Sequence, residues 1–262
     1  MRPASLFENL PVIQDPWFWA VAVPVVWLAG ISKSGFASGL ASLATPMMAL
    51  TVPVPQAAAV MLPLLLVMDA AGLQQLWRRR DRALVRLLVP WGLLGIALGT
   101  ALFGVMPAAA LSGLVGALTL LFVAQRLLAP PTADKPTAAP WVGRLCATLS
   151  GITSFIVHAG GPPIQAYVLP LRLAPLVTSA SLAVYFAVIN VAKVAPYALL
   201  GLLDLRNLAT AVLLMPLAGF GVWVGVRLLH RINATWFYRV AYTGMGLAGV
   251  KLLSDGLRAW FF

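Results

Sequence analysis

The stretch Gly30-Ile31-Ser32-Lys33-Ser34-Gly35 lies in the middle of an apolar run of 35 residues, 17–51. A straight helix of that length is about 52 Å long, whereas the hydrocarbon core of a bilayer is about 30 Å thick. Glycine and serine weaken a helix at this point, and a lysine is costly in lipid. We therefore expect this first segment to break or to turn back inside a membrane.

The composition of the chain predicts an integral membrane protein. Hydrophobic residues make up 61% of the 262 residues and charged residues 10%, which leaves too little polar surface to cover a soluble globule. The apolar runs do not alternate with polar residues, so helices are expected rather than a barrel. We expect an all-α fold with about eight hydrophobic segments, or eight to ten helices. The segments cover residues 17–51, 56–77, 83–106, 108–128, 141–171, 175–203, 205–229 and 234–253.

The chain carries signs of an internal duplication. Ser34-Gly35, Ser38 and Pro46 recur 116 residues later as Ser150-Gly151, Ser154 and Pro162, and Pro90, Gly95, Gly99 and Leu102 recur at an offset of 126 as Pro216, Gly221, Gly225 and Leu228. Two blocks in the same order predict two homologous halves, residues 1–128 and 141–262. Residues 129–140, rich in Pro, Thr and Ala, are expected to link them. Many transporters built this way hold their substrate where the halves meet.

The first segment of the second half carries its own break, His158-Ala-Gly-Gly-Pro-Pro163. Its prolines lack amide hydrogens and its glycines allow close approach of the backbone. Irregular backbone at membrane depth is tolerated where protein buries it or where it lines a wet cavity. Amides at the start of a half-helix suit an anionic ligand, so Gly160 and Gly161 are candidates for binding one.

Polar residues within the apolar segments point to the same region. Asp69 lies near the middle of residues 56–77, and Asn190 and Lys193 share one helix face near the middle of residues 175–203. A charge at the centre of a membrane helix costs about 2.5–3.5 kcal/mol, so it usually faces a cavity or a partner. Lys33 and His158 lie deep only if their segments break; in a straight segment Lys33 would snorkel to the far interface.

The candidate substrate-binding residues are Lys33, Ser34, Ser38, His158, Gly160, Gly161, Asn190 and Lys193. Asp69 and His158 are candidates for carrying a coupled proton, or, for Asp69, for pairing with a lysine in the empty site. Hydroxyl groups to complete an oxyanion shell are available from Ser34, Ser38, Thr153 and Ser154. We expect no metal and no cofactor.

The net charge of +11 does not indicate nucleic acid, because five arginines cluster at one turn between helices. They are Arg78, Arg79, Arg80, Arg82 and Arg86, and the positive-inside rule predicts that this loop is cytoplasmic. The orientation of the second half stays open, since parallel and inverted halves both leave twelve basic residues inside and four outside. The length of both first segments favours inversion. The expected partners are the bilayer and a small anion, with a homodimer left open.

Three stretches together resemble a known family. They are Gly30-Ile-Ser-Lys33 with Ser34-Gly35-Phe36, His158–Pro163 leading to Tyr167-Val-Leu-Pro170, and the run from Phe186 through Asn190 and Lys193 to Pro196-Tyr197. In this order they resemble the sulfite exporter TauE/SafE transporters over nearly the whole chain. The resemblance implies a bacterial inner-membrane permease for sulfur-containing or carboxylated anions such as sulfite, sulfonates or sulfoacetate. Many members carry Lys-Gly-Gly-Phe-Gly-Gly-Gly where this chain has Lys33-Ser-Gly-Phe-Ala-Ser-Gly39. The bulkier residues of this chain leave less of its backbone exposed.

These observations favour a secondary transporter that gives alternating access to a site between its halves. An enzyme is not expected, because two histidines, one cysteine and seven scattered carboxylates do not form a catalytic or metal-binding set. A passive anion channel would use the same buried cations. A non-transporting scaffold would leave the burial of Asp69 and Lys193 unexplained.

Overall fold

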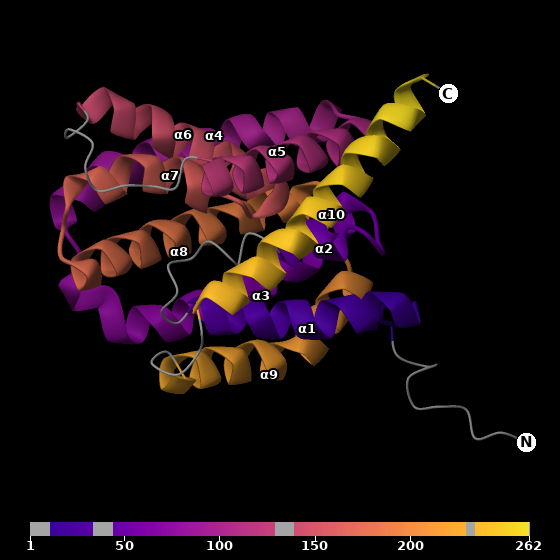
Figure 1. Ribbon diagram of the computed structural model, residues 1–262, viewed down its shortest axis with the longest axis horizontal. Coiled ribbons are helices and arrows are strands. Elements are labelled where there is room, and N and C mark those ends of the chain that lie inside the picture. Colours follow the sequence, from indigo (N-terminus) through magenta and orange to yellow (C-terminus); the bar gives the residue numbers. More distant parts are fainter. Residues whose placement is uncertain (1–10, 34–43, 129–138, 229–233, 262) are drawn as a thin grey trace, which may run out of the picture.

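The computed structural model describes residues 11–33, 44–128, 139–228 and 234–261, and every regular element within them is helical. In chain order these are α1 (Pro16–Lys33), α2 (Ala44–Met48), α3 (Val54–Leu76), η2 (Trp77–Arg79), α4 (Arg82–Val105), α5 (Ala108–Leu128), α6 (Pro140–Val157), α7 (Gly161–Val168), η3 (Leu169–Leu171), α8 (Pro175–Leu199), α9 (Leu205–Leu228) and α10 (Ala234–Phe261). Figure 1 shows the long helices lying side by side as a bundle, with α10 tilted across it. The all-α fold predicted from the sequence is confirmed.

Six helices in the described residues are long and apolar enough to cross a bilayer: α1, α3, α4, α5, α8 and α9. The expected count of about eight hydrophobic segments is therefore not confirmed. The sixth and tenth helices are not among the six, although α6 has 18 residues and α10 has 28. The protein is a multi-pass membrane protein.

Local sequence signals set where several helices begin. The Asp81 carboxylate caps α4, because its Oδ1 accepts hydrogen bonds from the backbone amides of Ala83 at 2.8 Å and Leu84 at 3.0 Å. Proline occupies one of the first two positions of α3, α6, α7 and α8, where its missing amide hydrogen costs nothing. These starts fix the turns at the ends of the bundle.

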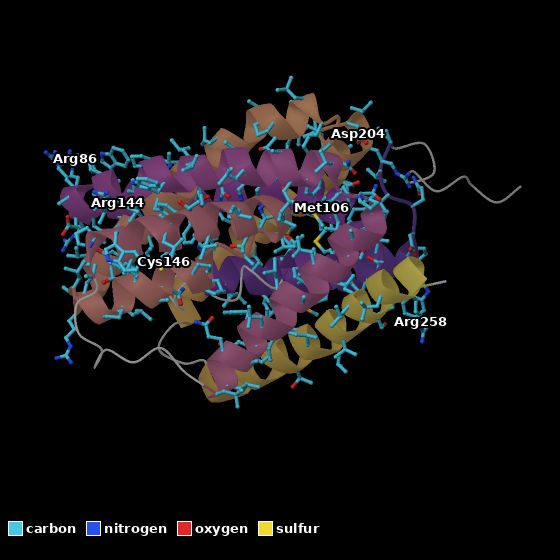
Figure 2. All side chains as sticks on the ribbon, turned by 90° about the horizontal axis from the view of Figure 1, so that it is seen from above. Arg86, Met106, Arg144, Cys146, Asp204 and Arg258 are labelled. Carbon is cyan, nitrogen blue, oxygen red and sulfur yellow. The ribbon has the colours of Figure 1, made fainter. Side chains whose placement is uncertain are left out.

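The starts of α4, α6 and α8 lie at one end of the bundle, which we call the basic edge. The backbone amide of Asp81 donates to Ser181 Oγ at 2.9 Å, which joins the start of α4 to the first turns of α8. Gly143, near the start of α6, lies against the ring of Tyr167, near the end of α7. The α6–α7 segment therefore enters and leaves at this edge. The described arginines here are Arg78, Arg79, Arg80, Arg82, Arg86, Arg144, Arg172 and Arg227, of which Figure 2 labels Arg86 and Arg144.

The opposite edge holds the starts of α1, α3 and α9. The backbone amide of Ile13 donates to Thr210 Oγ1 at 3.1 Å, and Gln56 Nε2 donates to Asn207 Oδ1 at 3.2 Å. Figure 2 shows Arg258 of α10 at this end as well. Because α1 and α3 both begin here, the α1–α2 segment enters and leaves at the opposite edge.

The two parts of the chain therefore run through the bundle in opposite senses. After the α1–α2 segment, α3, α4 and α5 lead in turn to the basic edge, back, and to the basic edge again. After the α6–α7 segment, α8 leads away from the basic edge, α9 leads back to it, and α10 leads away again (Figure 1). The two parts are therefore inverted relative to each other, an arrangement that the count of basic residues could not distinguish from a parallel one. The prediction that the first segment of each half is broken or re-entrant is confirmed.

Glycines bring two pairs of helices into backbone contact. A Cβ on Gly30 of α1 would lie 2.7 Å from the carbonyl oxygen of Ala218 in α9, and one on Gly151 of α6 would lie 2.3 Å from that of Gly92 in α4. The two pairs are related by offsets of 121 and 126 residues. The offset of 116 in the sequence matched Gly151 to Gly35, which lies outside the described residues, whereas the contacts match it to Gly30.

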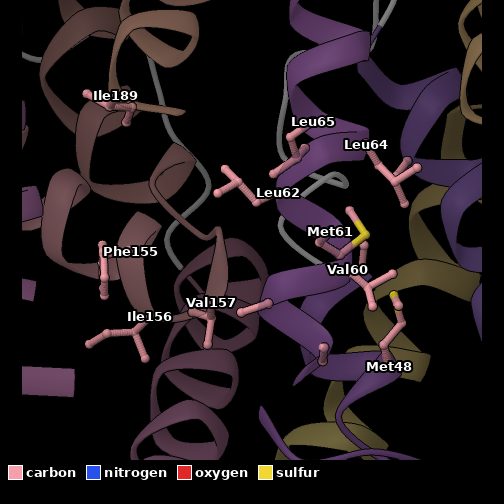
Figure 3. Packing of buried hydrophobic residues seen from close by; sticks show 14 of the residues in the cluster. Met48, Val60, Met61, Leu62, Leu64, Leu65, Phe155, Ile156, Val157 and Ile189 are labelled. Atoms are coloured by element: carbon pink, nitrogen blue, oxygen red, sulfur yellow. The ribbon is translucent and has the colours of Figure 1, made fainter. Parts of the chain in front are cut away.

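The apolar core lies between α3 and the second broken segment. Figure 3 shows Leu62 and Leu65 of α3 on the side that faces Phe155 and Val157 of α6 and Ile189 of α8. All of these side chains are buried and belong to one cluster. Polar groups enclosed by this packing interact in a medium of low dielectric constant, so their hydrogen bonds and charges act strongly on one another.

Candidate functional site

The first broken segment delivers a lysine to an ion pair. Lys33 is the last residue of α1, and its Nζ lies 2.7 Å from Asp69 Oδ1 of α3 and 3.5 Å from the carbonyl oxygen of Leu65. The two charged side chains are only 14% and 4% exposed. Lys33 therefore points into the bundle and does not snorkel to an interface.

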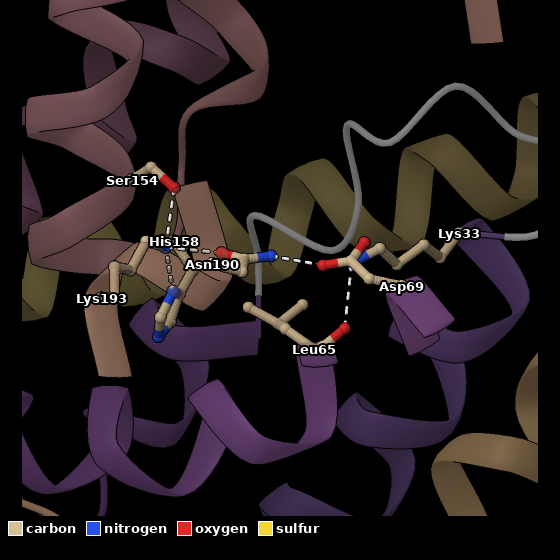
Figure 4. A network of polar contacts seen from close by, with 7 residues as sticks. All are labelled: Lys33, Leu65, Asp69, Ser154, His158, Asn190 and Lys193. Atoms are coloured by element: carbon tan, nitrogen blue, oxygen red, sulfur yellow. Dashed lines mark hydrogen bonds and ion pairs between the residues drawn. The ribbon is translucent and has the colours of Figure 1, made fainter. Parts of the chain in front are cut away.

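Asn190 of α8 continues the network from this ion pair. Its Nδ2 donates to Asp69 Oδ2 at 2.6 Å, and its Oδ1 accepts from Lys193 Nζ at 2.7 Å. The two neighbours fix the orientation of the amide, because a carboxylate can only accept and an ammonium can only donate. Asn190 thus separates an anionic group from a cationic one, as Figure 4 shows.

Lys193 lies at the centre of the second part of the network. Its side chain is fully buried, and its Nζ donates to Asn190 Oδ1, to Ser154 Oγ at 2.8 Å and to His158 Nδ1 at 3.0 Å. An ammonium group has three hydrogens, so these three acceptors use them all. Each acceptor is formally neutral, and the nearest carboxylate in the chain of contacts, Asp69, is reached only through Asn190.

The Nδ1 atom of His158 accepts a hydrogen bond from Lys193, because the other ring nitrogen, Nε2, already donates one. Nε2 lies 3.0 Å from the carbonyl oxygen of Ala58 in α3, which can only accept, so Nε2 carries the hydrogen and Nδ1 presents its lone pair. The imidazole in this arrangement is neutral. His158 also ends α6 with a left-handed backbone, φ 56°, a conformation that a non-glycine residue keeps only where its surroundings hold it.

The break after His158 is closed by hydroxyl groups of α6. Ser150 Oγ donates to the carbonyl oxygen of Gly160 at 2.6 Å, and Thr153 Oγ1 lies 3.0 Å from that of Ala159. A Cβ on Gly160 would lie 2.8 Å from the Ser150 carbonyl oxygen, so only glycine fits there. Gly160 and Gly161 are buried and shape the break, but the contacts drawn in Figure 4 do not include them.

Tyr197 of α8 holds the end of α6 from the other side. Its hydroxyl donates to the carbonyl oxygen of Phe155 at 2.6 Å, and its ring meets that of Phe155 edge to face at 5.0 Å. The His158 ring lies 6.1 Å from the Tyr197 ring, centre to centre. The position of His158 therefore depends on packing that reaches beyond the polar network.

The structure brings together most of the polar residues that the sequence singled out. Lys33, Asp69, Ser154, His158, Asn190 and Lys193 form one continuous network from α1, α3, α6 and α8. Ser34 and Ser38 lie outside the described residues. The network also uses the carbonyl groups of Ala58 and Leu65, which could not be predicted because a backbone carbonyl carries no side-chain signal.

A bundle of membrane-length helices, with two re-entrant segments that meet at buried cations, defines the chain as a multi-pass membrane protein of the transporter class. A family model described as sulfite exporter TauE/SafE matches residues 22–252, and the chain belongs to this family of membrane transporters. Neither curated proteins nor solved structures match the chain.

Proposed function

We propose that the protein is a secondary transporter of small sulfur-containing or carboxylated anions, of the sulfite, sulfonate or sulfoacetate type. The observation that carries this proposal is Lys193, a fully buried ammonium group whose three acceptors are all neutral. Removing an ammonium group from water costs several kcal/mol, and an anionic ligand offsets that cost. Lys33 supplies a second cation at the other end of the same network.

In this proposal the anion lies between the two broken segments, within reach of Lys33, Asn190 and Lys193. A charge-assisted hydrogen bond from Lys33 and the nearby positive charge of Lys193 supply affinity, and the Asn190 amide supplies direction. Ser34 and Ser38, which follow Lys33 in the sequence, and Gly160 and Gly161 of the break after His158 are proposed to line the same site with hydroxyl and backbone groups. His158 is proposed to hold Lys193 in place.

Alternating access follows from the inverted arrangement of the two parts of the chain. A site at the meeting point of inverted halves can open to either edge when one half rocks against the other. Residues 158–160 are a natural place for such movement, because regular helix is interrupted there between α6 and α7.

The basic edge is proposed to face the cytoplasm of a bacterial inner membrane. It carries the arginine cluster, and two of its arginines lie over indole rings: Arg80 3.9 Å from the centre of Trp77, and Arg227 3.6 Å from that of Trp223. Basic residues favour the cytoplasmic side, and tryptophan favours the membrane interface. A cysteine placed at Arg206 in a Cys146→Ser background should be labelled only from the periplasmic side.

The proposal is tested by flux in proteoliposomes that contain the purified protein. We expect saturable uptake of sulfite or sulfoacetate, with each anion inhibiting uptake of the other. Unitary currents in planar bilayers would indicate a passive anion channel instead. The absence of both flux and current for sulfite, sulfoacetate and small carboxylates would leave a scaffold as the remaining interpretation and would overturn the proposed transport.

A further inference from the structure

Asp69 occupies two hydrogen-bond donors that an anionic ligand would use. Its Oδ1 pairs with Lys33 Nζ at 2.7 Å, and its Oδ2 accepts a hydrogen bond from Asn190 Nδ2 at 2.6 Å. Asp69 is buried, and it is the carboxylate in the network of Figure 4. One oxygen on a lysine and the other on an amide is also the arrangement in which a carboxylate or sulfonate ligand would be bound. The carboxylate of Asp69 therefore fills the anion position from within the protein.

We propose that Asp69 is an internal competitor of the transported anion, which binds Lys33 and Asn190 only when Asp69 takes up a proton and releases them. This inference rests on the function proposed above and deepens it. Two anions cannot share donors at these distances, because like charges in a buried site repel strongly. A carboxylate displaced with its charge would be buried without a partner, whereas a protonated one is neutral.

The step therefore couples one proton to one anion. Before binding, the Asp69 carboxylate holds Lys33 and Asn190; afterwards a carboxylic acid and a bound anion are present, and the proton has come from the solution. No other bond forms or breaks. An anion that moves across the membrane with this proton is transported in symport, and the pH gradient contributes to its driving force.

The geometry favours Asp69 over His158 as the proton acceptor. Both ring nitrogens of His158 are occupied, and a hydrogen on Nδ1 would point at the Lys193 ammonium 3.0 Å away. The titratable groups that face Asp69 are Lys33 of α1 and, behind Asn190, Lys193 of α8. The described charged side chains of α9, which also packs on α3, lie at the two ends of the bundle.

The second half offers no competitor at the equivalent place. At the offset of 121 given by the glycine contacts, the residue that corresponds to Asp69 is Asn190, which has the same shape without the charge. The variant Asp69→Asn therefore places an amide at both positions and removes only the charge. An exposed ion pair on α10, Lys251 with Asp255 at 2.9 Å, supplies a matched control, Asp255→Asn.

The test measures sulfoacetate binding by calorimetry across a pH series, together with proton uptake in weak buffer. Both acid groups of sulfoacetate stay ionised at neutral pH, so any proton taken up binds to the protein. We expect the wild type and Asp255→Asn to take up one proton per anion, and their Kd to rise as the pH is raised. We expect Asp69→Asn to bind at least about tenfold more tightly at neutral pH, with no pH slope and no proton uptake.

The possible failures are distinguishable. Binding to the wild type without proton uptake, or an Asp69→Asn variant with the wild-type pH slope, overturns the role of Asp69 and leaves the proposed transport intact. A folded Asp69→Asn variant that no longer binds also overturns it. If sulfoacetate binds to neither protein, sulfoacetate is excluded as a substrate of the proposed function, and this inference fails with it. The proton count on the wild type requires no variant to fold.

Discussion

The two broken segments reach the same network with different chemistry. The first ends in Lys33, which pairs with the carboxylate of Asp69, whereas the second presents neutral acceptors, Ser154 and His158, to Lys193. At the offset of 121, Lys33 corresponds to Ser154 and Asp69 to Asn190. Equivalent positions thus hold an ion pair in one part of the chain and uncharged groups in the other.

The difference shows how two similarly built parts of one chain come to carry different charges at equivalent positions. The cation of the first segment is already neutralised by an internal anion, while Lys193 has none in contact. The buried network therefore carries two formal positive charges and one negative charge. In our account this imbalance attracts the substrate, and the ion pair keeps the site closed when it is empty. Four predictions test this comparison, from the largest expected effect to the smallest.

Breaking the Lys33–Asp69 pair from one side should have the largest effect on stability. Lys33→Met leaves a buried carboxylate with only the Asn190 amide and should cost about 3 kcal/mol of unfolding free energy. Adding Asp69→Asn should recover most of that loss. The exposed pair Lys251–Asp255 should show a coupling below about 1 kcal/mol in the same double-mutant cycle. Equal coupling energies for the two pairs, measured by denaturation in detergent, would contradict the buried role.

Removing the second cation should nearly abolish transport. Lys193→Met deletes the three hydrogen bonds at the centre of the network, and we expect sulfoacetate flux in proteoliposomes to fall about 100-fold. The matched control is Lys251→Met, which removes an exposed lysine and should stay within about twofold of the wild type. Wild-type flux in Lys193→Met would remove this lysine from the site.

The geometry of the second break should tolerate no added side chain. Gly160→Ala places a methyl group 2.8 Å from the Ser150 carbonyl oxygen and should destabilise the protein by about 2 kcal/mol. Gly219→Ala on α9 meets nothing within 4 Å and should be neutral or slightly stabilising, because alanine favours helix. Thermal unfolding of both variants checks this, and identical melting temperatures would show that the break is not tightly packed.

The smallest predicted effect separates two buried tyrosines. Tyr197→Phe and Tyr185→Phe each remove a hydroxyl that donates to a carbonyl of α6, and each should cost about 1 kcal/mol of stability. Only the Tyr197 hydroxyl bonds next to the end of α6, beside His158, so only Tyr197→Phe should also lower flux. Equal flux in the two variants would show that the end of α6 needs no support from Tyr197.

The sequence predicted the fold class and the depth of the key residues for reasons that the structure makes plain. The overlong first segments required a break, and the cost of burying Lys193 and Asp69 required partners. The i, i+3 spacing of Asn190 and Lys193 placed both on one helix face, where they share a hydrogen bond. Each of these inferences depends on local spacing or on the free energy that it costs to bury a charge in lipid.

What the sequence could not supply was set by the backbone and by tertiary packing. The identity of residue 58 could not predict that its backbone carbonyl fixes the tautomer of His158. Matching serines and glycines in the sequence gave an offset of 116, whereas the contacts between helices relate Gly30 to Gly151 at an offset of 121. The orientation of the second part of the chain needed contacts between helix ends, such as Asp81 with Ser181.

The most direct test of the central claim is an experimental structure of the protein with 2-bromoethanesulfonate, whose bromine is located by anomalous scattering. The account predicts a sulfonate within about 3 Å of Lys33 Nζ and Asn190 Nδ2, with the Asp69 carboxyl group displaced from both. A sulfonate bound at the basic edge, with the Lys33–Asp69–Asn190–Lys193 network unchanged, would contradict it.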